Sequence, residues 1–495
     1  MTRGLKKTTA LYASIAFISG FAVLAVEIAG TRLVSGTLGN SIYTWSALIA
    51  TVLLSLSIGS MAGGAWIDRR PQVKWLLVSL VFAAIATAIA PYVANIMHSE
   101  AASMSLVGGA LFECSLIFVL PGFAFGAVAP ICVKLLSVAA EGKQVGFSAG
   151  LISMAGSLGS FLGALVTPFW LIPNLSLTSL FLCLSGTVLL SSLLTLKLGP
   201  LTRAQASVIS LIAIGLFIAG AAQRTQAAEA PFIFDQYTSY HRIRVEEQKV
   251  GGRTARFLHL DTTLEGGIVT GVSNLPLEYQ NTWQLAQRWK LPVHRALCIG
   301  AGAFGVPQRL SQAYPNAVID VAEIDPKVIE AGYKFFDLAS FQRVVPQATD
   351  GRRFLSRSKD KYDLIFIDAY HGMRYIPPHL TTVEFFELCR EHLADHGIVM
   401  MNVISGVSLD KGELLGAFSA TVAKVFPACE FIPMNPMQLD QLQNVVLVCS
   451  TSALPETGGG RFFDVATVLT PQTVPLSDQK NPIEAILARQ LRQTD

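Results

Sequence analysis

The segment ALCIGAGAFG, residues 296–305, is a short apolar strand pattern that runs into a glycine-bearing turn. A turn of this kind at the end of a strand lets the backbone approach a ligand closely, and G-x-G-x-x-G occupies this place in dinucleotide-binding sheets. The motif alone is a weak signal, because glycines also serve ordinary tight turns. The meaning of the segment therefore depends on the residues around it.

Apolar runs of strand length alternate with amphipathic stretches on both sides of this turn. The runs cover residues 296–299, 317–321, 364–367, 398–403 and 445–448. Strands that alternate with helices predict an α/β domain with a parallel, doubly wound, Rossmann-like sheet.

A smaller β region precedes this sheet. Residues 241–248 and 255–260 read as strands joined by a turn at 250–252, and a second turn at Gly266 and Gly267 continues a small β-meander. A helical stretch at 279–289 then leads to the first strand of the large sheet.

Acidic residues follow the successive strands of the predicted sheet. Glu323 ends the second strand about 20 residues after the glycine turn, Asp350 follows the next short strand, and Asp368 ends the fourth. Because ligands of open α/β sheets bind at the carboxyl ends of the strands, the pattern of Gly, Glu, Asp and Asp predicts a nucleoside pocket. A plainer interpretation stays open, in which Glu323 and Asp325 cap a helix that opens at Pro326 and Asp350 caps the next one.

The first half of the chain has the composition of a membrane domain. The 495 residues are 52% hydrophobic and only 14% charged, and residues 1–230 hold 12 Lys or Arg and 6 Asp or Glu, against 25 and 28 in the rest. A bilayer span needs about 20 mostly apolar residues, and seven runs qualify: 9–29, 42–66, 75–95, 104–128, 146–172, 176–196 and 206–222. The composition argues against a disordered chain and, because the globular half is slightly acidic, against a nucleic-acid partner.

The chain is thus predicted to be a multi-pass protein of the cell (inner) membrane, with the lipid bilayer as a partner. The predicted regions are 1–230 (transmembrane), 231–290 (small β-domain and linking helix), 291–452 (Rossmann-like) and 453–495 (C-terminal tail, helical or flexible). The distribution of Lys and Arg predicts a cytoplasmic N-terminus, and seven spans would place the globular half outside the cytoplasm. Glu27 and Glu113 lie within spans, where a charge indicates a function or an internal ion pair, and Arg32 is a candidate partner of Glu27. The seven cysteines form no CxxC motif and indicate neither a disulfide framework nor a metal site.

Residues 232–452 and the first spans resemble the polyamine aminopropyltransferase (spermidine synthase-like) family, in its membrane-fused members with an N-terminal multi-span region. In the first spans the similarity is carried by Phe17-Ile18-Ser19-Gly20-Phe21 with Glu27 and Arg32, and by Gly64 with Asp68-Arg69. The resemblance implies a methyltransferase-type sheet preceded by a small β-domain. It also implies transfer of an aminopropyl group from decarboxylated S-adenosylmethionine, or a donor like S-adenosylmethionine, to an amine acceptor, without a metal, in a possible homodimer.

The resemblance also assigns roles to the residues at the strand ends. Gly300 and Gly302 match the donor-binding turn, Glu323 the ribose acceptor, Asp350 the adenine contact and Asp368 the catalytic carboxylate. Asp368 would help to deprotonate the amine that attacks the carbon beside the sulfonium.

The sequence departs from the family at the turn and after the catalytic carboxylate. The family turn reads GGGDG, and its Asp binds the donor's amino group; here Ala303 takes that place and Phe304 follows. A second family Asp, three residues after the catalytic one, is His371, which is a candidate general base or a surface residue of the loop.

Other family positions are also altered. Tyr279, Gln280 and Asn281 do not match the family's tyrosine and glutamine in register, and the late substrate loop at 433–441 has no Tyr or Trp. Glu265 stands near a donor-ribose glutamine of the family or is a solvated turn residue. Two alternatives therefore remain: a methyltransferase-like enzyme acting on a membrane-delivered substrate, and a non-catalytic nucleoside-binding or transport protein.

Overall fold

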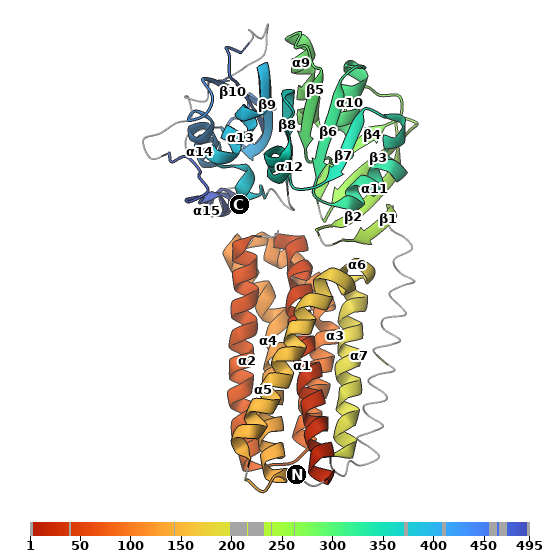
Figure 1. Cartoon of the computed structure of the whole chain (residues 1–495), viewed down its shortest axis with the longest axis vertical. Coiled ribbons are helices and arrows are strands. Elements are labelled where there is room, and N and C mark those ends of the chain that lie inside the picture. The colour runs from red at the N-terminus through yellow and green to blue at the C-terminus, as the bar shows by residue number, and fades with distance from the viewer. Residues whose placement is uncertain are drawn as a thin grey trace. The chain divides into compact units, whose positions relative to one another are not determined.

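The computed structural model divides the chain into two compact units, Met1–Ala230 and Pro231–Asp495. It describes residues 3–38, 41–142, 144–198, 215, 232–238, 240–261, 263–370, 375–407, 412–454, 463–464 and 473–492. The first unit is helical and the second contains both sheets (Figure 1).

The helical unit is a bundle of long apolar helices. Its elements are α1 (Arg3–Leu38), α2 (Ile42–Arg69), α3 (Lys74–Ser103), α4 (Leu106–Ala139), α5 (Val145–Val166), the π-helical η1 (Thr167–Leu171), α6 (Ile172–Asn174), α7 (Leu177–Ser192) and the 3₁₀ helix η2 (Leu193–Lys197). In the described residues, six helical segments are long and apolar enough to cross a membrane. The seventh predicted span, 206–222, lies outside the described residues apart from residue 215.

Glycines let these helices approach closely. A Cβ at Gly59 would lie 2.0 Å from the carbonyl oxygen of Phe123, and a Cβ at Gly159 would lie 1.9 Å from that of Phe17. The first contact joins α2 to α4 and the second joins α5 to α1. Close backbone packing of this kind stabilises helix pairs in lipid, where no hydrophobic effect drives them together.

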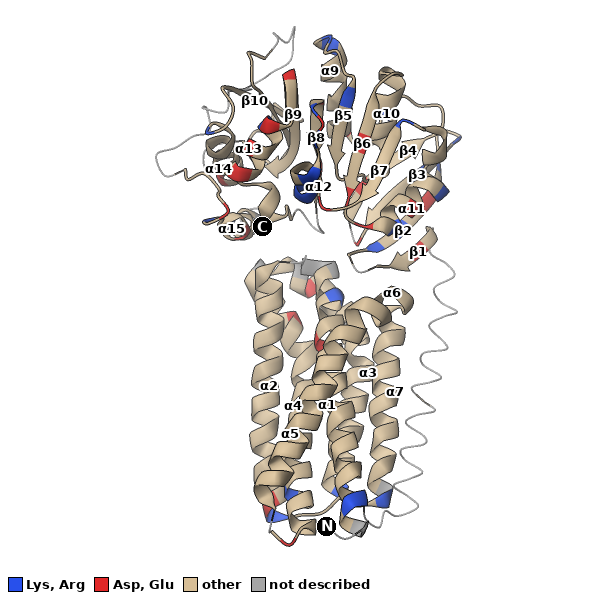
Figure 2. Cartoon of the chain, in the orientation of Figure 1, with Lys and Arg blue, Asp and Glu red and all other residues tan. Residues whose placement is uncertain are grey.

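Charged residues of the bundle are concentrated at one end. Most of the Lys and Arg side chains lie at the end that carries the N-terminus (Figure 2), where Lys134 pairs with Asp68 at 2.7 Å. Inside the bundle, the fully buried Glu113 of α4 bonds His98 of α3, with 2.7 Å between Oε1 and Nδ1. The sequence identified Glu113 but gave it no partner.

The second unit begins with a four-stranded antiparallel meander in the order β1-β2-β3-β4. Its strands are β1 (Phe232–Tyr237), β2 (Arg242–Val250), β3 (Arg253–Leu260) and β4 (Thr263–Val269). The turn at Gly251 and Gly252 is confirmed, but the expected turn at Gly266 and Gly267 is wrong, because both glycines lie within β4. Gly267 instead allows close packing, since a Cβ there would lie 2.6 Å from the ring of Phe257.

The large sheet has eight strands in the order β12-β10-β11-β9-β8-β5-β6-β7. The strands are β5 (Arg295–Ile299), β6 (Val318–Glu323), β7 (Val344–Ala348), β8 (Tyr362–Ile367), β9 (Leu393–Ser405), β10 (Ala428–Pro433), β11 (Gln443–Ser450) and β12 (Phe463–Asp464). The five strands from β5 to β9 are parallel, which confirms the Rossmann-like prediction. The expectation of a wholly parallel sheet is wrong, because β11 is antiparallel to both β9 and β10. Residues 434–442 between β10 and β11 are too few for the crossover of about a dozen residues or more that a parallel pair needs, so these two strands pair antiparallel.

Helices cover both faces of this sheet. They are η4 (Glu278–Trp283), α9 (Gln284–Arg288), α10 (Gly305–Ala313), α11 (Pro326–Phe335), η5 (Leu338–Ser340), α12 (Gly351–Arg357), η6 (Pro378–Leu380), α13 (Val383–Glu391), α14 (Glu413–Val422) and α15 (Ile483–Arg492). Alternate residues of β5 enter two different apolar cores, with Leu297 and Ile299 in one and Ala296 and Cys298 in the other. The sheet therefore has no solvent-facing side along β5, as expected for a doubly wound fold.

The sequence left open whether the chain after residue 453 is helical or flexible. Its last described part is helical, and Leu476, Ile483 and Ile486 are buried in the first of these cores. Residues 473–492 therefore belong to the packed globular unit.

Candidate active site

The residues predicted at the strand ends lie along one edge of the large sheet. Glu323 is the last residue of β6, and Gly300 and Asp368 directly follow β5 and β8. Asp350 comes two residues after β7. Because β5 to β8 are parallel, their carboxyl ends share this edge.

The glycine turn is in tight contact with the ends of β8 and β4. Gly300 has a φ of +89°, and a Cβ there would lie 2.2 Å from the carbonyl oxygen of Asp368. Gly302 has a φ of +48°, and its Cβ would lie 2.8 Å from the carbonyl oxygen of Glu265. Both positions therefore need glycine, both for backbone conformation and for space.

Glu323 is held by backbone N–H groups on either side. Its Oε2 accepts a hydrogen bond of 3.0 Å from the N–H of Ala301 in the glycine turn, and its Oε1 accepts one of 2.9 Å from the N–H of Asp325. Burial raises the pKa of Glu323, and these two bonds act in the opposite direction. The arrangement fixes the carboxylate beside the turn with lone pairs left for a ligand hydroxyl.

Asp368 is hydrogen-bonded at both of its carboxylate oxygens. Its Oδ2 accepts a bond of 2.8 Å from the hydroxyl of Tyr279, and its Oδ1 accepts one of 3.0 Å from Nδ2 of Asn402. Asn402 is itself oriented by Asn444, whose Nδ2 donates to its Oδ1 at 3.0 Å. Burial raises the pKa of Asp368, although the bonds from Asn402, Tyr279 and Gln280 offset part of the effect. A carboxylate with a raised pKa is a better proton acceptor near neutral pH.

Tyr279 and Gln280 belong to this site, contrary to the expectation that they are out of register. Both lie on η4 and are buried, and Nε2 of Gln280 contacts the hydroxyl of Tyr279 at 3.4 Å. The pKa of Tyr279 is raised well above its ordinary value by burial and by Asp368, so its hydroxyl stays protonated as a donor. The adjacent Tyr and Gln after the meander were a usable signal for this site. Their position relative to the strand ends, however, depends on the path of residues 270–277.

Glu265 is also part of the site, and its interpretation as a solvated turn residue is wrong. It lies within β4, and Nε2 of Gln280 donates to its backbone carbonyl at 3.2 Å. Its Oε1 is buried and has no hydrogen-bond partner among the described residues. The pKa of Glu265 is raised well above its ordinary value by burial, then by the charges of Asp368, Asp261 and Glu323.

Phe304 does not occupy the ligand side of the turn. It has a φ of +59° at the N-cap of α10 and is completely buried. Its ring packs against α11, where a Cβ at Gly332 would lie 2.6 Å from it. The bulky residue after Ala303 therefore fills the core.

Asp350 has a capping role, as its plainer interpretation predicts. Its Oδ1 accepts a bond of 2.9 Å from the N–H of Arg353 at the start of α12, and its Oδ2 lies 2.7 Å from Nε2 of His379. Burial would raise the pKa of Asp350, but the bonds from His379 and Arg353 outweigh it, and the pKa is lowered. Asp350 also borders a surface hollow of about 600 Å³ that includes Ile324 after β6 and Tyr240. The residue therefore lies at a cavity as well as at a helix end.

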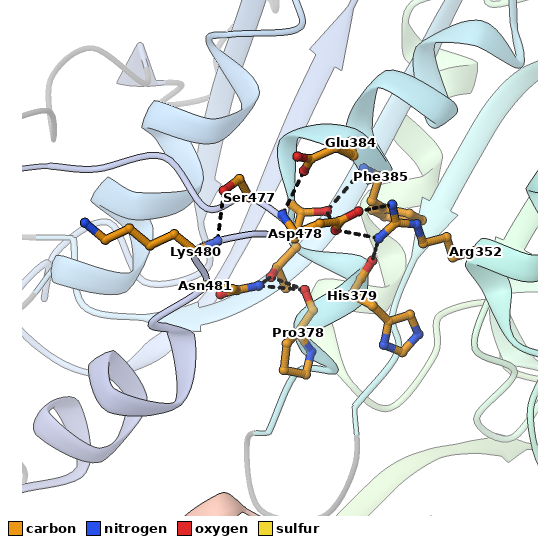
Figure 3. A network of polar contacts seen from close by, with 11 residues as sticks. Arg352, Pro378, His379, Glu384, Phe385, Ser477, Asp478, Lys480 and Asn481 are labelled. Carbon is orange, nitrogen blue, oxygen red and sulfur yellow. Dashed lines mark hydrogen bonds and ion pairs between the residues drawn. The ribbon is translucent and has the colours of Figure 1, made fainter.

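A polar network fixes the loop that carries His379 (Figure 3). Asp478 accepts two bonds from the guanidinium of Arg352, at 2.7 and 2.6 Å, and one of 2.8 Å from the hydroxyl of Thr382. Nδ2 of Asn481 donates to the carbonyl of Pro378 at 2.8 Å. The segment before α15 thus holds η6 beside α12. His371, the other candidate base, lies outside the described residues.

The comparisons with known proteins point to one family. Residues 290–454 match the model of the spermine/spermidine synthase domain. The chain is 32% identical over 173 residues to a probable polyamine aminopropyl transferase of Bifidobacterium longum, covering 33% of this chain and 38% of that relative. It is 22% identical over 435 residues to polyamine aminopropyltransferase 2 of Aquifex aeolicus, covering 84% of both chains. The crystal structure of a probable spermidine synthase from Corynebacterium glutamicum has a TM-score of 0.42 at 22% identity, over 48% of this chain and 92% of that one.

The match to the family model and to the two polyamine aminopropyl transferases confirms the resemblance that the sequence indicated. Residues 290–454 are thus similar to the spermine/spermidine synthase domain, and the two relatives above are named polyamine aminopropyl transferases, which are transferases. The chain spans only 38% and 43% of the length of its Bifidobacterium longum and Vibrio vulnificus relatives.

Proposed function

We propose that this chain is a membrane-anchored transferase that moves an aminopropyl-type group from a decarboxylated S-adenosylmethionine-like donor to an amine. The observation that carries the proposal is Asp368, a carboxylate with a raised pKa that is oriented by Tyr279 and Asn402 beside the glycine turn. The homology to polyamine aminopropyltransferases supports the same reaction.

The residues at the sheet edge have the chemistry that this donor needs. Glu323 offers a fixed carboxylate for ribose hydroxyls, and Gly300 and Gly302 allow the turn to pack closely against the backbone at Asp368 and Glu265. Asp350 borders the hollow next to this edge and is proposed to accept from the adenine amino group. The donor's positive sulfonium would be attracted by the carboxylates of Asp368 and Glu265.

In the proposed reaction, the amine attacks the methylene carbon beside the sulfonium. A C–N bond forms, the C–S bond breaks, and the sulfur leaves as a neutral thioether, methylthioadenosine. The attacking nitrogen loses one proton, which Asp368 accepts and passes to solvent. Tyr279 and Asn402 hold the carboxylate in place during this transfer, and His371 is a second proposed base.

Turnover by the full-length chain in detergent tests the proposal. With decarboxylated S-adenosylmethionine and putrescine, we expect methylthioadenosine and an aminopropylated amine by mass spectrometry. Asp368→Asn should lower the rate by about 10²- to 10⁴-fold, the usual range for a proton acceptor. The matched control is Asp337→Asn, at an exposed residue of the same type before η5. Equal rates in the two variants would contradict the role of Asp368.

A methyltransferase-like reaction remains the second candidate, and its supporting observation is a sequence match. The chain is 25% identical over 163 residues to a Drosophila melanogaster protein named eEF1A lysine and N-terminal methyltransferase homolog, and His371 stands where the family has a second carboxylate for a diamine. The same assay with S-adenosylmethionine distinguishes the two, because methyl transfer yields S-adenosylhomocysteine. Nucleoside binding without either product would indicate the non-catalytic alternative.

We further propose a cytoplasmic N-terminus and a location in the cell (inner) membrane. Lys and Arg gather at the N-terminal end of the bundle, as the positive-inside rule predicts (Figure 2). If residues 206–222 also cross, the globular unit lies outside the cytoplasm. Reporter phosphatase fusions after residues 198 and 230 test this proposal. The fusion after residue 198 should be inactive. Activity of the fusion after residue 230 would require residues 206–222 to cross the membrane. Light scattering of the purified chain tests the proposed homodimer.

A further inference from the structure

A buried carboxyl group lies inside the apolar bundle, where α3 and α4 pack together. Glu113 of α4 is fully buried, and its Oε1 lies 2.7 Å from Nδ1 of His98 on α3. Its other oxygen, Oε2, has no hydrogen-bond partner among the described residues. An ionisable group within a membrane span is costly, and where one is kept it usually marks a binding site or a path for an ion or a proton.

The two residues of this pair differ in how they can be reached. Both belong to segments that are long and apolar enough to cross a membrane, Lys74–Ala101 and Val107–Ala139. Lys134, which pairs with Asp68, is 21 residues further along α4, a distance of about 30 Å at the helical rise per residue. The side chain of His98 is 31% exposed, whereas that of Glu113 is not exposed at all. Glu113 is therefore reached from outside through His98.

His98 is the charge partner of Glu113. α4 packs against α1, α2, α3 and α5, and among the described residues of the chain His98 is the only Lys, Arg or His that forms an ion pair with Glu113. α5 carries no titratable side chain. The other titratable residues in the half of the bundle around Glu113 are Glu27 and Arg32 on α1, Tyr43 on α2, Tyr92 and Glu100 on α3, and Cys114 on α4. The charge of Glu113 is thus balanced by a partner that itself gains and loses a proton.

Polar groups without partners continue along the same face of α3. Thr87 is completely buried, and its hydroxyl has no hydrogen-bond partner in the part of the chain that the structure describes. Its carbonyl also lacks the usual helical donor, because Pro91 has no N–H group. Thr87 precedes His98 by eleven residues, so the two lie on one face of α3, about three turns and about 16 Å apart. The polar character of this face therefore extends from His98 toward the middle of the bundle.

We propose that Glu113 and His98 form a proton-binding site of the membrane unit, which takes up and releases one proton through His98. When a proton arrives at Nε2 of His98, the imidazole passes the proton on its Nδ1 to Oε1 of Glu113, and release follows the reverse path. The carboxyl group then becomes neutral, which is the form that an apolar surrounding favours. Two side chains are too few to hold a metal ion, and the described residues contain no group of three or more His, Cys, Asp or Glu that could do so.

The site gives the membrane unit a function of its own. Uptake of a proton changes the charge inside the bundle by one unit, and carboxyl and histidine groups within membrane spans form the proton relays of pumps and transporters. The membrane unit is therefore expected to respond to a proton gradient. This function does not depend on the group transfer proposed for the globular unit.

Infrared difference spectroscopy of the full chain in liposomes tests the inference, from about pH 5 to about pH 8, the range in which histidine changes its charge. A buried carboxyl group that takes up a proton adds a C=O stretching band at the lower pH. We expect this band in the wild type, its loss in Glu113→Gln, and its retention in the matched control Glu100→Gln, at an exposed residue of α3. Glu113→Asp keeps a titratable carboxyl group and should keep a band at a shifted frequency. Absence of the band in the wild type, or its survival in Glu113→Gln, would overturn the inference.

The rate at which the band appears tests the role of His98. After a rapid drop in pH, the band should form at least about tenfold more slowly in His98→Gln than in the wild type, because glutamine can hydrogen-bond to Glu113 but cannot pass on a proton. Imidazole added to the buffer should restore part of the lost rate. Equal rates in His98→Gln and the wild type would overturn the uptake through His98. Because the band reports on the membrane unit, a chain without transferase activity would contradict the proposed function and leave this inference intact.

Discussion

Tyr279→Phe isolates a single hydrogen bond at the proposed proton acceptor. The hydroxyl of Tyr279 donates to Oδ2 of Asp368 at 2.8 Å, and Asn402 serves the other oxygen. Burial raises the pKa of Asp368, while the bonds from Asn402, Tyr279 and Gln280 lower it. Removing the Tyr279 hydroxyl keeps the burial and deletes one stabilising donor, so the pKa should rise further.

The size of the shift follows from the strength of a bond to a charged group. Such a bond contributes about 1.5–3 kcal/mol, and one pKa unit corresponds to about 1.4 kcal/mol, so the pKa of Asp368 should rise by about one to two units. Asp368 accepts a proton only when ionised, that is, above its pKa. The acidic limb of the profile of kcat/KM against pH should therefore move upward by about one to two pH units.

The assay is methylthioadenosine release by the full chain from pH 5 to pH 9, with saturating amine. The control is Tyr333→Phe, at a half-exposed tyrosine of α11. An acidic limb that stays in place in Tyr279→Phe, or moves to lower pH, would refute the assignment of Asp368 as the titrating base. A uniform loss at every pH would indicate that Tyr279 binds substrate without tuning the carboxylate.

Two further predictions concern stability and the glycine turn. Asp478→Ala removes the bonds from Arg352 and Thr382, and because Asp478 is about two-fifths exposed the free energy of unfolding should fall by only about 1 kcal/mol. The bond from Arg352 lowers the pKa of Asp478 in the folded state. The stabilisation by Asp478 is therefore present above the pKa of the unfolded state and is lost as the pH falls through the pKa of the folded state. Chemical unfolding should show that the stabilities of the variant and the wild type converge in acid. Gly300→Ala puts a Cβ 2.2 Å from the carbonyl oxygen of Asp368 at a positive φ, which costs about 1–2 kcal/mol from the backbone conformation alone, and calorimetry should show the loss of methylthioadenosine binding.

The large features of the fold could be predicted because each leaves a periodic trace in the sequence. Long apolar runs indicated the bundle helices, and the alternation of apolar and amphipathic stretches indicated the α/β sheet. The direction of β11 could not be predicted, because an apolar run has the same pattern in either direction. The turn at Gly266 and Gly267 was misplaced because these glycines serve close packing, Gly266 beside Gln280 and Ala303 and Gly267 against Phe257.

The predicted and the missed site residues differ in how they reach the site. Glu323 ends β6 and Asp368 follows β8, and because these strands are parallel within one sheet, strand order alone brings the two residues to the same edge. Glu265 and Tyr279 come from β4 and η4, and they meet the glycine turn only through packing between separate elements, as in the contact of Gly302 with the Glu265 carbonyl. An acidic residue directly before two glycines within an apolar strand pattern was the available signal for Glu265.

Phe304 shows how an altered turn can keep an open ligand side. An L-residue at positive φ costs about 1–2 kcal/mol, and Phe304 adopts such a conformation at the N-cap of α10. Full burial of a phenylalanine side chain contributes about 1.5–3 kcal/mol, and its ring is buried against Gly332. The cost of the positive φ and the gain from burying the ring are of similar size, so the packing of Phe304 in the core offsets the strain of the turn. The groups left on the turn before Phe304 are then the small residues from Gly300 to Ala303, none of which carries a charge.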